Sequence, residues 1–148
     1  ESEHEKVKGT LSYRVQVLKD INMADRLVKP EKLTLFFHLI SASNLPAMDR
    51  TGLCDPYFDI FVGDKTAKSA VKKANRDPFY NEYFEFNMES QFEELILTCM
   101  DHDVMSKNDE MGAIVVPLVR VQQLEVMEKE LPLINHTHAA GGNGVVNV

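Results

Sequence analysis

Short apolar segments separated by turn residues constrain this fold more than any other feature of the sequence. Within segment 11–18, hydrophobic and polar side chains alternate, which is the period of a β-strand with one buried face. The other candidate strands are residues 33–40, 56–62, 66–73, 80–86, 94–100, 112–118, 131–134 and 145–148. Many short strands with few helix signals predict an all-β fold, an eight-stranded antiparallel β-sandwich, with one candidate strand more than that sandwich needs.

The remaining segments are expected to connect these strands within one domain. Residues 19–31 have some helical character but run into Pro30, so we interpret them as a connector. Residues 119–128 are expected to form one or two helical turns. A chain of 148 residues with 44% hydrophobic content suits a single core. We therefore predict an N-terminal flank over residues 1–8 and one domain over residues 9–148.

The N-terminal segment and the cysteines bear on the compartment. The first residues are charged and contain no signal-peptide core, and no apolar run approaches the ~20 residues that span a bilayer. The chain does not begin with Met, so we expect a piece of a longer protein. Two cysteines, Cys54 and Cys99, favour free buried thiols in a reducing, cytoplasmic setting, and a single disulfide between them stays open.

Charge excludes one class of partner and directs attention to two segments. The net charge is −7, with 23 acidic and 16 basic residues, which argues against nucleic-acid binding. The acidic residues concentrate in segments 49–55 and 101–109, and a basic run lies between them. If the fold brings the two segments together, their carboxylates form an oxygen-rich pocket suited to Ca²⁺, which takes six to eight oxygen ligands. Without a cation, such a cluster would be costly.

Rival chemistries fit these residues less well. An EF-hand loop would need a third oxygen residue at Met105 and a glycine at Ser106. A zinc site would need more Cys and His ligands than Cys54, Cys99 and His102 provide. No nucleophile elbow, phosphate-binding glycine loop or His-Glu-x-x-His helix is present. The chain is therefore not expected to be an enzyme, although it could regulate one in a longer parent protein.

Three ordered motifs resemble the C2 domain, the calcium- and phospholipid-binding module of synaptotagmins and protein kinase C. Residues 45–57 are similar to the family's first loop with its Asp-Pro-Tyr ending, and residues 101–112 to its third loop. Residues 77–86 resemble the pattern Asn-Pro-x-aromatic-Asn-Glu-x-Phe-x-Phe, with Asp77 in place of Asn. The resemblance covers about residues 33–134 and implies a C2-type Greek-key sandwich.

The family has two circularly permuted topologies, and the sequence leaves the choice between them open. Residues 9–13 resemble the first strand of one form, and residues 144–148 resemble the last strand of the other.

The resemblance also implies a ligand set for two to three Ca²⁺ ions. Five acidic side chains match the family's ligands: Asp49, Asp55, Asp101, Asp103 and Asp109. The backbone carbonyls of Met48, His102 and Lys107 are expected to complete the coordination, and Ser106 offers a hydroxyl. The function so implied is calcium-dependent binding to anionic phospholipid membranes. The chain would be a targeting module of a larger trafficking, exocytosis or signalling protein, recruited from the cytoplasm to the membrane surface.

Lipid contacts are implied at two further places. Leu53, Val104 and Met105 lie near the expected loop tips, where they could insert into a membrane. The resemblance to the family's phosphoinositide site is only partial, because Asp59 and Ala70 stand where that site has lysines. Its candidate residues here are Tyr57, Lys68, Asn108 and the compensating Lys72. A solvated strand face explains these residues equally well. The alternative function is a protein–protein interaction module, either calcium-regulated or calcium-independent.

Overall fold

The computed structural model describes residues 9–19, 33–90, 93–121 and 127–132. Within these ranges the chain forms eight strands and one short 3₁₀ helix. In chain order the elements are β1 (Thr10–Lys19), β2 (Leu33–Ser43), β3 (Pro56–Val62), β4 (Lys65–Lys68), β5 (Phe79–Met88), β6 (Glu94–Asp101), β7 (Asp109–Pro117), η1 (Leu118–Arg120) and β8 (Met127–Pro132).

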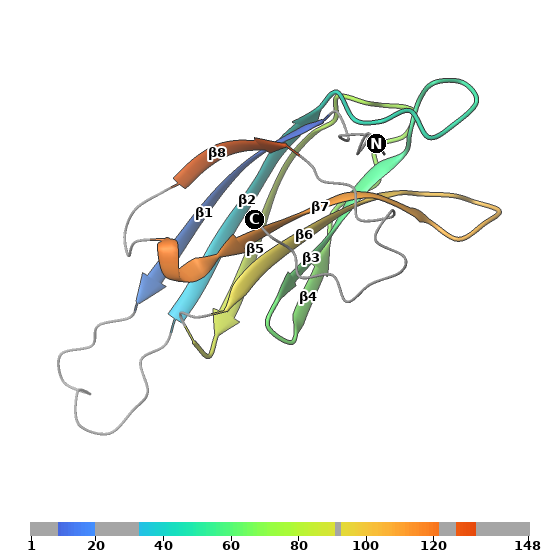
Figure 1. The fold of residues 1–148 in the computed structure, drawn as a ribbon. Coiled ribbons are helices and arrows are strands. Elements are labelled where there is room, and N and C mark those ends of the chain that lie inside the picture. The colour runs from blue at the N-terminus through green and yellow to red at the C-terminus, as the bar shows by residue number, and fades with distance from the viewer. Residues whose placement is uncertain (1–8, 20–32, 91–92, 122–126, 133–148) are drawn as a thin grey trace, which may run out of the picture.

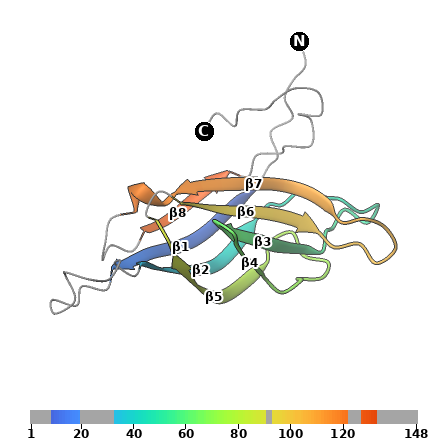
Figure 2. The ribbon, with the colours of Figure 1, turned by 90° about the horizontal axis from the view of Figure 1, so that it is seen from below.

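The strands form two four-stranded sheets that pack face to face, as Figures 1 and 2 show from two directions. One sheet has the order β5-β2-β1-β8 and the other β4-β3-β6-β7. Every paired strand in both sheets is antiparallel to its neighbour. The prediction of an all-β, eight-stranded antiparallel sandwich is therefore confirmed.

The core lies between the sheets and follows the two-residue period of the strands. In β2, Leu35, Phe37 and Leu39 are buried at 0–1% exposure, while Phe36 between them is 39% exposed. Leu95 and Leu97 of β6 are fully buried on the facing sheet. Removing this apolar surface from water is the main term that stabilises the sandwich, at about 25 cal/mol per Å².

The N-terminal strand belongs to the sandwich and occupies an interior position. β1 pairs with β2 on one side and with β8 on the other. The sequence leaves open whether this strand or the C-terminal segment 145–148 completes the sheet. β1 occupies the position, and residues 145–148 lie outside the described residues.

Several element boundaries predicted from the sequence are wrong. The predicted strand 66–73 ends at Lys68, because beyond it the backbone leaves the regular β3 ladder and Ala70 N–H donates to the Glu82 carboxylate of β5. Of the segment 119–128 that was predicted to form helical turns, η1 contains Val119 and Arg120, and Met127 and Glu128 already belong to β8. Residues 122–126 lie outside the described residues. β8 thus starts four residues before the predicted strand 131–134. The connector predicted over 19–31 overlaps the described residues only at Lys19, which ends β1, and the rest of it lies outside them.

Cys54 and Cys99 are free and buried, as expected for structural thiols. Burial is the main cause that raises the pKa of the Cys54 thiol to about 11, and the nearby Asp101 carboxylate raises it further. Both thiols are therefore held in the neutral form. In the described ranges, no helix is long and apolar enough to span a bilayer.

Three loops meet at one end of the sandwich. The first loop (44–55) joins β2 to β3, the second loop (69–78) joins β4 to β5, and the third loop (102–108) joins β6 to β7. The end of β6 lies beside the start of β3, since Asp101 is paired with Pro56. In Figure 1 all three loops lie on the right, at the opposite end of β7 from η1. The two acidic segments thus share one end, as the metal hypothesis requires.

Candidate metal centre

The first loop is shaped by backbone hydrogen bonds around a glycine. The N–H groups of Met48 and Asp49 both donate to the Leu53 carbonyl at 3.0 Å, and Gly52 N–H donates to the Asp49 carbonyl at 3.0 Å. Gly52 has a φ of 78°, a left-handed conformation that residues with a Cβ rarely adopt. This turn reverses the chain directly after Asp49.

Asp55 connects the three loops through hydrogen bonds. Its N–H donates to Asp101 Oδ1 at 2.6 Å, and its carbonyl accepts the His102 N–H at 3.0 Å. Its Oδ1 accepts the Ala74 N–H of the second loop at 2.7 Å. Asp55 therefore holds the end of β6 and the second loop in place around the first loop.

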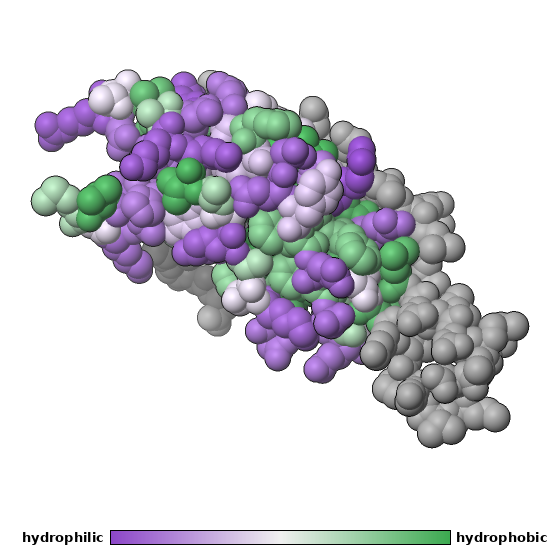
Figure 3. Space-filling view, turned by 180° about the vertical axis from the view of Figure 1, so that it is seen from behind, coloured by the Kyte–Doolittle hydropathy of each residue, from purple (hydrophilic) through white to green (hydrophobic). Residues whose placement is uncertain are grey.

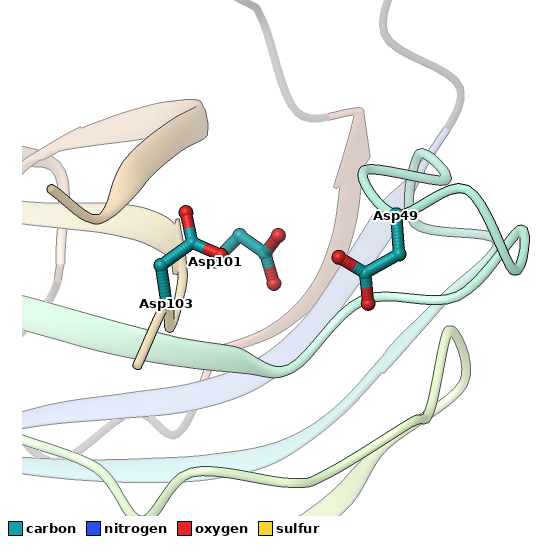
Figure 4. A group of neighbouring side chains, drawn as sticks. All are labelled: Asp49, Asp101 and Asp103. Atoms are coloured by element: carbon teal, nitrogen blue, oxygen red, sulfur yellow. The ribbon is translucent and has the colours of Figure 1, made fainter. Parts of the chain in front are cut away.

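Three of the five predicted ligands converge. Asp49, Asp101 and Asp103 each offer a carboxylate oxygen, and these oxygens lie within 4.8 Å of one another. Figure 4 shows the Asp49 carboxylate on the first loop facing Asp101 at the end of β6, with Asp103 beside it. Asp101 is buried at 3% exposure, whereas Asp49 is exposed.

Electrostatics at this cluster disfavour the bare carboxylates. Burial is the largest cause that raises the pKa of Asp101 above its usual value, and the neighbouring charges of Asp49, Asp103 and Asp55 raise it further. The hydrogen bond from Asp55 N–H acts in the opposite direction. A buried carboxylate surrounded by others is stabilised by a hard divalent cation. The donor set, which consists of oxygens alone, fits calcium.

The other two predicted carboxylates lie close by but outside this group. Asp109 begins β7 directly opposite Asp101 in the strand register and is exposed. Asp55 uses one carboxylate oxygen to accept the Ala74 N–H. Their role as additional ligands stays a prediction.

The remaining predicted ligands are in the same loops. Met48 precedes Asp49, and His102 lies between Asp101 and Asp103. Ser106 Oγ donates a hydrogen bond to Asp103 Oδ2 at 2.9 Å, so here the hydroxyl orients a carboxylate. The carbonyls of Met48, His102 and Lys107 stay predicted ligands.

The predicted membrane-insertion residues lie on the surface. Met105 is 97% exposed and Val104 is 85% exposed, both in the third loop, while Leu53 of the first loop is 36% exposed. Figure 3, which views the molecule from behind, shows green side chains projecting among purple ones at the loop end on the left. Apolar side chains with this exposure at a loop tip are available to a partner surface.

Three residues of the partly matched phosphoinositide site, Tyr57, Lys68 and Asn108, lie in contact around the Tyr57 side chain. Lys68 Nζ lies 3.4 Å from Asp59 Oδ1 and 4.6 Å from the centroid of the Tyr57 ring. Asn108 Nδ2 donates to the Tyr57 hydroxyl at 2.8 Å. Lys72 Nζ lies 5.6 Å from the centroid of the Tyr80 ring. Asp59 thus offsets the charge of Lys68 where the family's site would have a further lysine.

Sequence reasoning missed the part played by the second loop. Ala74 N–H binds Asp55, Asn75 N–H donates to the Cys54 carbonyl at 2.9 Å, and the Arg76 guanidinium donates to the Leu45 carbonyl. These bonds join residues that are distant in the sequence, and they depend mostly on backbone groups. No side-chain pattern in the sequence could have indicated them.

A β-sandwich with a carboxylate cluster enclosed by loops at one end defines a class of protein, the ion- or membrane-binding β-sandwich modules. The chain belongs to the C2 domain family, whose model matches residues 33–133. Members of this family are membrane- or calcium-binding modules and are generally not enzymes.

Curated relatives support this assignment. Synaptotagmin-A of Diplobatis ommata is 33% identical over 119 residues, which cover 74% of this chain and 27% of that protein. Multiple C2 domain and transmembrane region protein 8 of Arabidopsis thaliana is 38% identical over 89 residues, 60% of this chain and 9% of that protein. The chain thus spans only a small part of these relatives.

Solved structures support the fold. The first C2 domain of RIM from Drosophila superposes with a TM-score of 0.67 at 18% identity, covering 86% of this chain and 98% of that one. The third C2 domain of KIAA1228 protein gives a TM-score of 0.73 at 15% identity, covering 93% and 95%. At these identities the likeness concerns the fold alone.

Proposed function

We propose that this chain is a calcium-dependent targeting module that binds anionic phospholipid membranes through its three-loop end. The observation that supports this most strongly is that carboxylate oxygens of Asp49, Asp101 and Asp103 lie within 4.8 Å of one another, and that Asp101 is buried. The exposed third-loop residues Val104 and Met105 lie beside this cluster. A cation site and an apolar tip at the same end suit an anionic phospholipid membrane, whose head groups are negatively charged and whose interior is apolar.

The three clustered carboxylates would hold the first ion, and Asp55 and Asp109 would extend the site to two or three ions. Bound calcium supplies positive charge that offsets the carboxylates and leaves coordination positions for lipid phosphate oxygens. Without it, the clustered carboxylates are repelled by an anionic leaflet. The loop backbone keeps the carboxylates in place in either case, because Asp55 joins all three loops.

Apolar insertion and basic residues would add to the affinity. Full burial of an aliphatic or thioether side chain in the membrane contributes about 1.5–3 kcal/mol. We expect a contribution of this size from Met105 and Val104 and a smaller one from Leu53. Lys72 would add about 1 kcal/mol near an anionic surface, and Lys68 would add less because Asp59 offsets its charge. We propose general attraction to anionic lipid rather than a specific phosphoinositide site, since Asp59 lies 3.4 Å from the Lys68 ammonium.

The relatives are much longer than this chain. We therefore propose that the module, residues 9–148, serves a larger protein of vesicle traffic, exocytosis or signalling, and that calcium recruits it from the cytoplasm to a membrane surface. Protein partners of that larger protein would be additional ligands of the module.

Liposome co-sedimentation tests the proposed function. With vesicles containing phosphatidylserine, we expect the chain to pellet in calcium and to stay in the supernatant in EGTA or magnesium, because Mg²⁺ demands stricter octahedral geometry and dehydrates reluctantly. Neutral phosphatidylcholine vesicles are the lipid control. Equal pelleting in calcium and EGTA, or none in either, would contradict the proposal, and the second outcome would favour a protein-binding module.

Met105→Ala is expected to weaken calcium-dependent vesicle binding by about tenfold. The side chain is 97% exposed, so its truncation removes apolar area that only a membrane would bury. Calcium affinity measured without lipid should stay at the wild-type value. Val119→Ala is the matched control, since Val119 is 54% exposed in η1 at the other end of the sandwich. Equal loss in the two variants would argue against insertion by the third loop.

A further inference from the structure

The Asn108 side chain joins the third loop to the neighbouring strand β3. Its Oδ1 accepts the backbone N–H of Asp103 at 2.9 Å, and its Nδ2 donates to the Tyr57 hydroxyl at 2.8 Å. The Asn108 amide therefore bonds a predicted calcium ligand, Asp103, through its oxygen. Through its nitrogen it bonds Tyr57, which lies 51 positions from Asn108 in the sequence.

Tyr57 is a rigid anchor for this amide. It is 3% exposed and is paired with Met100 in the β3–β6 ladder. Lys68 Nζ lies over its ring at 4.6 Å, and the His102 ring packs edge-on against it with centroids 6.4 Å apart. The phenol therefore has little freedom to move away from Asn108.

The third loop needs such an anchor because most of its residues face solvent. Residues 104–107 are all exposed, and they separate Asp103 from Asn108. Within the loop, the Ser106 hydroxyl bonds the Asp103 carboxylate, but Ser106 is itself exposed. The Tyr57–Asn108 pair is the described contact that ties the Asp103 backbone to a buried residue of the sheet.

We infer that Tyr57 and Asn108 are positioning residues, which hold the Asp103 backbone so that its carboxylate faces Asp49 and Asp101. The inference rests on the proposed calcium function and extends it. Tyr57 and Asn108 were matched to a phosphoinositide site, but here they are hydrogen-bonded to each other. Their role is to preorganise the metal centre. Supporting partners of this kind typically change metal affinity by about 10- to 100-fold when removed.

Tyr57→Phe tests the inference because it removes the hydroxyl and keeps the ring. In EGTA, we expect the Asp103 amide to exchange with solvent about tenfold faster, measured by NMR, with an unchanged melting temperature. In calcium, we expect about tenfold weaker affinity by calorimetric titration. Tyr83→Phe is the matched control, since Tyr83 is 73% exposed on β5 of the other sheet.

A double-variant comparison separates positioning from general destabilisation. Asn108→Ala removes both bonds and should weaken calcium binding at least as much as Tyr57→Phe. Because the two residues act in series, Tyr57→Phe in the Asn108→Ala background should cause no further loss. Fully additive losses, or faster exchange throughout the β-sheets in Tyr57→Phe, would mean that Tyr57 supports the fold only and would overturn the inference.

The two proposals fail in different ways. If the wild-type chain binds no calcium, the proposed function is rejected, and the exchange rate of the Asp103 amide in EGTA still decides whether Tyr57 positions the third loop. If the wild type binds calcium and Tyr57→Phe matches it in both affinity and Asp103 exchange, the function stands and the positioning role is rejected.

Discussion

Replacing Asp101 and Asp103 together by asparagine is expected to abolish calcium binding in calorimetric titration, with at least about a 100-fold loss of affinity. Calcium affinity in proteins varies over several orders of magnitude with the charge of the ligand set. This double variant removes two of the three carboxylates that converge within 4.8 Å. Calcium-dependent pelleting with phosphatidylserine vesicles should be lost with it. Unchanged heats would refute the assigned ligands.

The double variant should fold normally in EGTA. The asparagine that replaces Asp101 would keep an oxygen to accept the Asp55 N–H. The same change removes a buried carboxyl whose pKa is raised by burial and by neighbouring acids. The melting temperature of the variant in EGTA is therefore expected to equal or exceed that of the wild type. Asp64→Asn with Glu85→Gln is the control of equal charge change, placed in the β3–β4 turn and on the exposed face of β5.

Phe58→Ala is expected to lower the free energy of unfolding by about 3–5 kcal/mol. Phe58 is fully buried on β3 and packs edge-on against Tyr80, with ring centroids 5.5 Å apart. Truncation leaves a cavity between the two sheets. Because small domains are stable by only about 5–15 kcal/mol, urea denaturation should show a large shift of the midpoint.

Phe79→Ala provides the comparison for this core variant. The chemical change is the same, but Phe79 is 63% exposed at the start of β5, so the expected loss is under about 1 kcal/mol. Similar losses for the two variants would contradict the assignment of Phe58 to the core.

The strands that were predicted well are those in which apolar residues occupy the buried positions and alternate with more exposed ones. In β2, alternate residues such as Leu35, Phe37 and Leu39 are apolar and buried, so the two-residue period visible in the sequence is the period of the fold. The chemical type of the site was likewise visible, because Asp side chains grouped in two segments suit only a few kinds of ligand.

The predicted elements that failed depend on partners far away in the sequence. Residues 66–73 were predicted to form one strand, yet β4 ends at Lys68, and the Ala70 N–H donates to the Glu82 carboxylate of the other sheet. The segment around Met127 resembles a helix end but pairs with β1, near the other end of the chain. Local patterns contain no information about such pairings, because the competing hydrogen bonds come from other strands.

By itself, the sequence determined the kind of fold and the kind of chemistry, since alternation and acidity are properties of single segments. Only the tertiary structure decided which acids converge: Asp49, Asp101 and Asp103 meet because the start of β3 pairs with the end of β6. It also decided that Tyr57 and Asn108 bond each other beside Asp103. The physical reason is that a cation pocket and its supporting hydrogen bonds depend on distances of a few ångströms, and antiparallel strand packing sets those distances.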